Sequence, residues 1–157
     1  MKLYLLLIIL SWIFVQDVRQ RAVYWFLFPV LCAVGIWYKW NSLLIEMIKW
    51  NTFFIVFCLV MLSFYVSIKE KTWTPIWKGY FSWGDICFLG AIIPILPFPT
   101  FLVYFTFGTI LALFIHTISL LKNEKVNTIP YAGYMAATLI PVLLLEHKLQ
   151  PWILANL

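Results

Sequence analysis

Apolar runs separated by short polar segments cover most of this 157-residue chain. A helix needs about 20 mainly apolar residues to cross a bilayer whose hydrocarbon core is ~30 Å thick. The pattern therefore predicts an all-α integral membrane protein, a polytopic bundle of about six transmembrane helices that forms one domain over residues 1–157. The runs that we expect to form these helices are residues 1–15, 22–38, 52–68, 86–96, 101–121 and 129–145.

The first run, residues 1–15, is short for a spanning helix. At ~1.5 Å per residue it does not cross ~30 Å of hydrocarbon, so we expect the helix to continue through Gln16 and Asp17. The run resembles a signal peptide in length, but Trp12 and Phe14 stand where a cleavage site needs small residues. We therefore expect this helix to remain in the mature protein.

Segments of mixed character lie between the runs. Residues 39–51 carry apolar side chains at helical spacing among charged ones, which predicts a short helix in the membrane interface. Residues 72–82 are rich in aromatic side chains and predict a second interfacial segment. Three prolines within residues 94–99 predict a short fourth helix that turns tightly into the fifth. Residues 146–157 are expected to form a polar tail.

Composition agrees with a membrane protein. Hydrophobic residues make up 64% of the chain and charged residues 11%, whereas soluble domains carry about 25% charged residues. The net charge of +5 is spread over the loops, which indicates contact with the lipid bilayer and argues against nucleic acid as a partner. Cys32, Cys58 and Cys87 lie in or beside apolar runs without a CxxC pair, so we expect no disulfide framework, no metal and no cofactor.

Asp17 and Asp85 are the only aspartates in the chain, and each marks a boundary between apolar and polar sequence. A carboxyl at a bilayer boundary is costly and usually faces the protein interior or a water-filled cavity, so each is a candidate functional group. Two other interpretations stay open. Asp17 lies close to Arg19 and Arg21, which is also typical of a solvated charge that only sets the membrane topology. Asp85 follows Gly84, which is also typical of an N-cap residue that opens a helix.

The basic residues favour a topology in which both aspartates face the cytoplasm, because seven lie on the aspartate side and four lie opposite. Two carboxyls in one partly dry site cannot both ionise easily, so one holds a proton. Such a pair can act as general base and general acid on a water molecule, which is aspartic-protease chemistry. The seven basic residues on the aspartate side of the membrane are Arg19, Arg21, Lys69, Lys71, Lys78, Lys122 and Lys125, and the four on the opposite side are Lys2, Lys39, Lys49 and Lys148.

The stretch Ser82-Trp83-Gly84-Asp85 resembles the GxGD motif of the type IV prepilin peptidases, a family of membrane aspartic peptidases. Asp85 and Gly84 match the motif, whereas Ser82 replaces its first glycine. If that glycine allows a left-handed backbone, we expect Ser82 to strain the turn, so that Ser82→Gly keeps or raises activity. The alternative is that the Ser82 hydroxyl holds the Asp85 carboxylate.

Two further features match the same family. Asp17, followed by a basic turn that includes Arg21, corresponds to its first catalytic aspartate, although Ile-Pro-Asn is replaced by residues 22–24. Pro130 lies in the Ile-Pro-aromatic start of the last helix. The amino-terminal region with paired CxxC motifs that larger members carry is absent, so the resemblance does not imply methyl transfer or a metal.

The resemblance implies an endopeptidase in the cell inner membrane. It would cleave the leader of a type IV pilin-like precursor, a short basic segment followed by a hydrophobic helix, at the cytoplasmic face, with Asp17 and Asp85 as the catalytic pair. The alternative is a polytopic membrane protein without enzymatic activity, such as an assembly subunit or a proton-coupled carrier. The oligomeric state is left open.

Other polar residues have structural interpretations. His116 lies within an apolar run, where a lone histidine is more often hydrogen-bonded between helices than catalytic. His147 is assigned no role. Cys87 has no basic neighbour in sequence and is expected to be buried and inert. Glu46 is expected on the interfacial helix, and Glu124 in a solvated loop.

Overall fold

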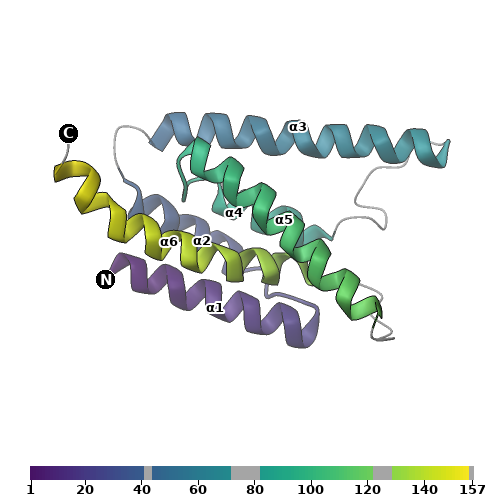
Figure 1. Ribbon diagram of the computed structural model, residues 1–157, viewed down its shortest axis with the longest axis horizontal. Coiled ribbons are helices and arrows are strands. Elements are labelled where there is room, and N and C mark those ends of the chain that lie inside the picture. Colours follow the sequence, from purple (N-terminus) through teal and green to yellow (C-terminus); the bar gives the residue numbers. More distant parts are fainter. Residues whose placement is uncertain (41–43, 72–81, 122–128, 156–157) are drawn as a thin grey trace.

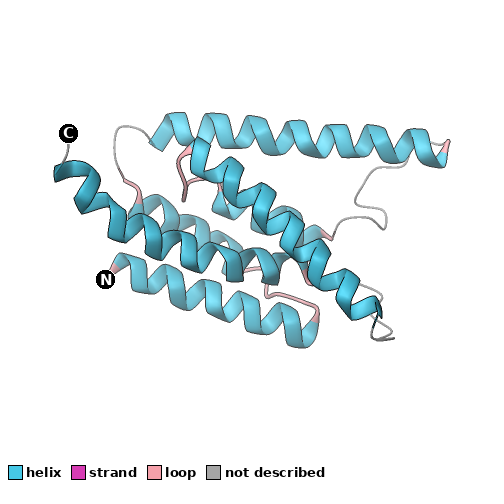
Figure 2. Cartoon of the chain, viewed as in Figure 1, coloured by secondary structure: helices cyan, strands magenta, loops and turns pink. Residues whose placement is uncertain are grey.

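A computed structural model describes residues 1–40, 44–71, 82–121 and 129–155. Regular structure in these ranges is entirely helical, and successive helices run in alternate directions along the long axis (Figure 1), with only short loops described between them (Figure 2). The helices are α1 (Lys2–Gln20), α2 (Leu27–Tyr38), α3 (Leu44–Glu70), α4 (Trp83–Ile92), α5 (Phe98–Leu121) and α6 (Tyr131–Ala155).

Three of these helices have the length and apolar composition needed to cross a membrane: α1, α3 and residues 98–118 of α5. The all-helical membrane class expected from the sequence is thus supported. Helices α2 and α4, with 12 and 10 residues, are shorter than the roughly 20 residues that a full crossing needs. Helix α1 continues through Gln16 and Asp17, as the length argument predicts.

Helix α2 begins five residues later than the apolar run that predicts it, at Leu27 instead of residue 22. Pro29 therefore lies in the first turn of the helix and not in its middle. A proline there removes an N–H group that has no helical partner in any case, so the position is favourable and needs no kink.

Helix α3 is continuous from Leu44 to Glu70, so the prediction of a separate interfacial helix over residues 39–51 is wrong. No proline or glycine occurs within α3 to end the first helix before the apolar run. Residues 41–43, and residues 72–81 of the second expected interfacial segment, lie outside the described residues.

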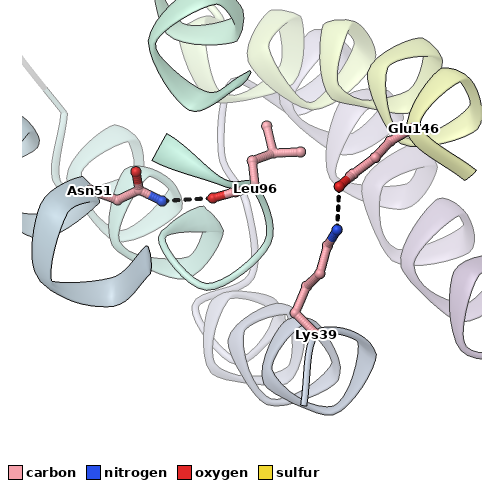
Figure 3. A network of polar contacts seen from close by, with 4 residues as sticks. All are labelled: Lys39, Asn51, Leu96 and Glu146. Carbon is pink, nitrogen blue, oxygen red and sulfur yellow. Dashed lines mark hydrogen bonds and ion pairs between the residues drawn. The ribbon is translucent and has the colours of Figure 1, made fainter. Parts of the chain in front are cut away.

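The prolines after α4 produce the tight turn that the sequence predicts, and Asn51 of α3 stabilises it (Figure 3). The Asn51 side chain is fully buried, and its amide nitrogen donates to the carbonyl oxygens of Ile93 and Leu96, both at 2.9 Å. The carbonyl of Ile93 would normally accept from the residue four positions later, which is Pro97 and has no N–H. Asn51 replaces this missing donor and joins α3 to the α4–α5 turn.

Helix α6 extends to Ala155 and includes most of the segment expected as a polar tail, so that expectation is wrong. Glu146 forms an ion pair with Lys39 at the end of α2 (Figure 3), and both side chains are largely buried. This pairing gives the charged part of α6 a packed environment, which explains why the helix does not end with the apolar run.

Helices α1 and α6 lie side by side although they are the first and last of the chain (Figure 1). Together with α2 and α4 they enclose the main core, in which Leu10, Ile13, Phe88, Met135 and Leu139 have no exposed surface. Helix α5 packs on α6, and α3 packs on α5. The core therefore fixes the end of α1, the start of α4 and the start of α6 relative to one another.

Candidate active site

The two aspartates meet at the start of α6. The first N–H groups of a helix have no partner within it. Here the N–H of Ala132 donates to Oδ1 of Asp85 at 3.1 Å, and the N–H of Gly133 donates to Oδ2 of Asp17 at 2.6 Å. Because these two donors are consecutive in the chain, the carboxyls lie side by side. The partial positive charge of the helix start stabilises negative charge on either of them.

Asp17 is placed by the last turns of α1. Its side chain is 8% exposed, and its carbonyl accepts from the N–H of Arg21, which ends the helix in a left-handed conformation with φ 54°. Gln16, also buried, accepts from the N–H of Tyr24 at 3.1 Å and so holds the returning chain against α1. Asp17 lies close enough to both Asp85 and Arg21 for electrostatic interaction.

Asp85 is placed by a capping box at the start of α4. The hydroxyl of Ser82 donates to Oδ2 of Asp85 at 2.7 Å, and the N–H of Ser82 donates to the same oxygen at 3.2 Å. In return, the N–H of Asp85 donates to the Ser82 hydroxyl at 3.1 Å. The N-cap interpretation of this region therefore applies to Ser82, with Asp85 as the third helical residue.

Ser82 has φ −78° and ψ 151°, an ordinary extended conformation. The expectation that a serine here strains the turn is therefore wrong. An N-cap residue adopts this conformation normally, and serine is among the preferred residues. Gly84 lies inside α4, and an added Cβ there would meet only ordinary contacts, the shortest at 3.5 Å to Ser82 Oγ.

Asp85 belongs to none of the three helices of membrane-spanning length. Burial and hydrogen bonding shift the pKa of its carboxyl in opposite directions. Burial raises the pKa of Asp85 above its ordinary value, while the hydrogen bonds from Ser82 and from Ala132 partly oppose that rise. Asp85 can therefore hold a proton at a higher pH than an exposed aspartate can. This is the property that one member of an acid–base pair requires.

Gly133 is a site residue that the sequence interpretation missed. A Cβ at this position would lie 3.0 Å from both Cβ and Oδ2 of Asp17 and 3.4 Å from the carbonyl oxygen of Phe14. A larger residue here would require α6 or Asp17 to shift by a few tenths of an ångström. A glycine three residues after Pro130 costs helix stability, which is the one signal in the sequence that points to it. Pro130 itself is buried just before α6.

A small apolar cavity lies among α3, α4, α5 and α6. Its volume is about 140 Å³. Leu89, one turn after Asp85, and Tyr131, just before Ala132, both line it. The hydroxyls of Tyr131 and Thr109 are 3.1 Å apart. This apolar space therefore begins one turn from Asp85 along α4, and neither aspartate lines it.

The other candidate residues lie away from this site. Cys87 is exposed on α4, so the expectation that it is buried is wrong. His116 is half-buried within α5, and Glu46 and His147 are exposed, while Glu124 lies outside the described residues. Within the described ranges, no group of three or more histidine, cysteine, aspartate and glutamate side chains could hold a metal ion.

The fold and the site define an all-helical protein with membrane-length helices and a buried pair of carboxyls at one end. Comparison with known proteins adds nothing to this description, because no family model, no curated protein and no solved structure matches the chain.

Proposed function

We propose that this protein is a membrane aspartic endopeptidase that removes the leader of type IV pilin-like precursors, with Asp17 and Asp85 as its catalytic pair. The observation that carries the proposal is the meeting of these residues, from separate helices, on consecutive amides of α6. In the mechanism, a water molecule attacks the peptide carbonyl while the ionised carboxyl takes a proton from that water. The protonated carboxyl then donates its proton to the leaving amine.

The proposed location follows from the charges around the site, and the proposed substrate is the one that the resemblance to the type IV prepilin peptidases implies. Helices α1 and α3 both run towards the end that holds the aspartates (Figure 1) and finish in Arg19, Arg21, Lys69 and Lys71. Basic residues of this kind favour the cytoplasmic side of the cell membrane. A precursor with a short basic leader before a hydrophobic helix would place its cleavage point at this boundary. The surrounding bilayer is the second partner.

A second candidate function is supported by the same hydrogen bonds. Carboxylates stabilise helix starts, so Asp17 and Asp85 could serve only to cap α6 in a membrane protein without enzymatic activity, such as an assembly subunit. The two functions differ in one requirement. A helix cap needs an acceptor oxygen, whereas the peptidase also needs a proton that the carboxyls exchange.

The direct test is co-expression of the full chain with a pilin-like precursor tagged at its carboxyl terminus. We expect a shorter product, cut between leader and hydrophobic helix. The control is a precursor whose basic leader residues are replaced by glutamine.

Reporter fusions test the topology: fusions after Arg21 and Lys71 should report the cytoplasm, and a fusion after Trp40 should report the opposite side of the membrane. A full-length precursor, or reporters on opposite sides after Arg21 and Lys71, would contradict the proposal.

Ser82→Ala is expected to slow cleavage, because it removes the hydroxyl that donates to Asp85. A hydrogen bond to a charged group contributes about 1.5–3 kcal/mol, so we expect a loss of about tenfold or more. Ser82→Thr keeps the hydroxyl and should retain most of the rate. Thr117→Ala is the control, because that hydroxyl bonds only to Leu113 of its own helix. Rates are compared at equal protein level. An unchanged cleavage rate in Ser82→Ala would show that the Ser82 hydroxyl does not contribute to catalysis.

A further inference from the structure

The outer face of α1 carries a long apolar groove. Helix α1 lies at the edge of the bundle (Figure 1), and the groove has a volume of about 650 Å³ with an almost wholly apolar lining. It extends from Tyr4 past Ile8 and Trp12 to Gln20, a distance of roughly 24 Å at ~1.5 Å per residue. A groove of this length and composition on a membrane-length helix suits a hydrocarbon chain.

The groove adjoins a second cavity of opposite character at the start of α1. This cavity measures about 490 Å³ and has a mainly polar lining that includes Lys2, Lys39, Trp40 and His147. Tyr4 lines both spaces, so the polar cavity and the apolar groove meet at this residue. Together they form an amphipathic site, with the polar cavity at one end, a mainly apolar groove along α1, and Arg19 and Gln20 at the far end of the groove.

The described residues around the polar cavity carry an excess of positive charge. Lys39 is neutralised by its ion pair with Glu146. Lys2 donates one hydrogen bond to the carbonyl of Trp37 at 3.0 Å and lies over that ring. Lysine has three donors, so the Lys2 ammonium has two left for a ligand. A phosphodiester carries a negative charge and so complements this excess.

We propose that this site binds one anionic phospholipid, with its phosphodiester at Lys2 in the polar cavity and one acyl chain in the groove along α1. A zwitterionic lipid lacks the net charge that the cavity favours. A partner helix would fill the apolar groove but leave the cationic cavity without a counter-charge. The polar end of the site, at Lys2, lies at the opposite end of α1 from Asp17, and Asp17 does not line the groove. This inference therefore does not depend on the proposed peptidase activity.

Lipid binding to the full chain in detergent can be measured by native mass spectrometry. We expect phosphatidylglycerol to bind one molecule per chain, at least fivefold more tightly than phosphatidylcholine. Lys2→Gln should remove most of this preference, and Ile8→Trp, which fills the groove at an exposed position, should weaken binding of phosphatidylglycerol. Lys49→Gln is the control, because Lys49 is exposed on α3 and lines neither space. Lys39 is left unchanged, because its removal would strand Glu146.

Three outcomes would overturn the inference. The first is equal binding of phosphatidylglycerol and phosphatidylcholine, and the second is an unchanged preference in Lys2→Gln. The third is binding of glycerol 3-phosphate, which has no acyl chain, as tightly as the whole lipid, because the site would then be an anion site without a role for the groove.

Discussion

Asp17→Asn and Asp85→Asn should each slow cleavage of a co-expressed precursor by roughly 10²–10⁴-fold, the range that positioned acid–base groups contribute. An asparagine side chain still offers one oxygen to the amide of Ala132 or Gly133, so the bond to the start of α6 can survive the change. At position 85, an NH₂ group would then face the N–H of Ser82 in place of the second oxygen. The exchangeable proton is lost. The double variant should be no slower than the slower single variant, because the two groups act as one unit.

The measurement is the amount of processed precursor at equal protein level, with melting temperature as the check on folding. Glu46→Gln provides a matched change, since Glu46 is an exposed carboxylate on α3, and it should leave the rate unaltered. Near-normal cleavage by either asparagine variant would show that the aspartate concerned is only a helix cap.

Gly133→Ala should slow cleavage by roughly 10- to 100-fold, the cost of a small misplacement of a catalytic group. The added methyl group would lie 3.0 Å from Oδ2 and Cβ of Asp17, which is tighter than most contacts of a Cβ atom, so its neighbours must shift by a few tenths of an ångström. Either α6 moves away from α1 or the Asp17 side chain rotates. In both cases the hydrogen bond from Gly133 to Asp17 is lost or lengthened.

The control for this change is Gly90→Ala, because a Cβ at Gly90 of α4 would meet no atom within 4 Å. Alanine favours helix over glycine by about 1 kcal/mol, so this variant should be equally or more stable and fully active. If Gly133→Ala cleaves as fast as Gly90→Ala, the close approach of α6 to Asp17 is not needed for catalysis.

The parts of the fold that depend on local pattern could be predicted from the sequence. Helix α1 continues past residue 15 because a membrane crossing requires the length, and the prolines near Pro97 end α4 in a tight turn. The sequence pattern predicts two helices where the structure has only α3, because Glu46 and Lys49 interrupt the apolar pattern. Charged residues at the end of a long helix do not stop it, and no proline or glycine follows them.

Only the carboxyl groups of the candidate site could be predicted from the sequence. Asp17 and Asp85 stand out because charged residues are rare in apolar sequence. Their partners are backbone amides of α6, and every residue except proline has such an amide, so no residue type marks Ala132. The hydrogen bond from Gly133 spans 116 positions in the chain, and no local pattern carries information over that separation.

The side-by-side packing of α1 and α6 has a consequence for how the protein is made. Asp17 lies in α1, which leaves the ribosome before its amide partner at the start of α6. During synthesis the carboxyl is therefore without this partner until the residues of α2 to α5 have been produced. The paired site comes into existence only when α6 reaches α1, so a chain truncated before residue 129 would enter the membrane without it.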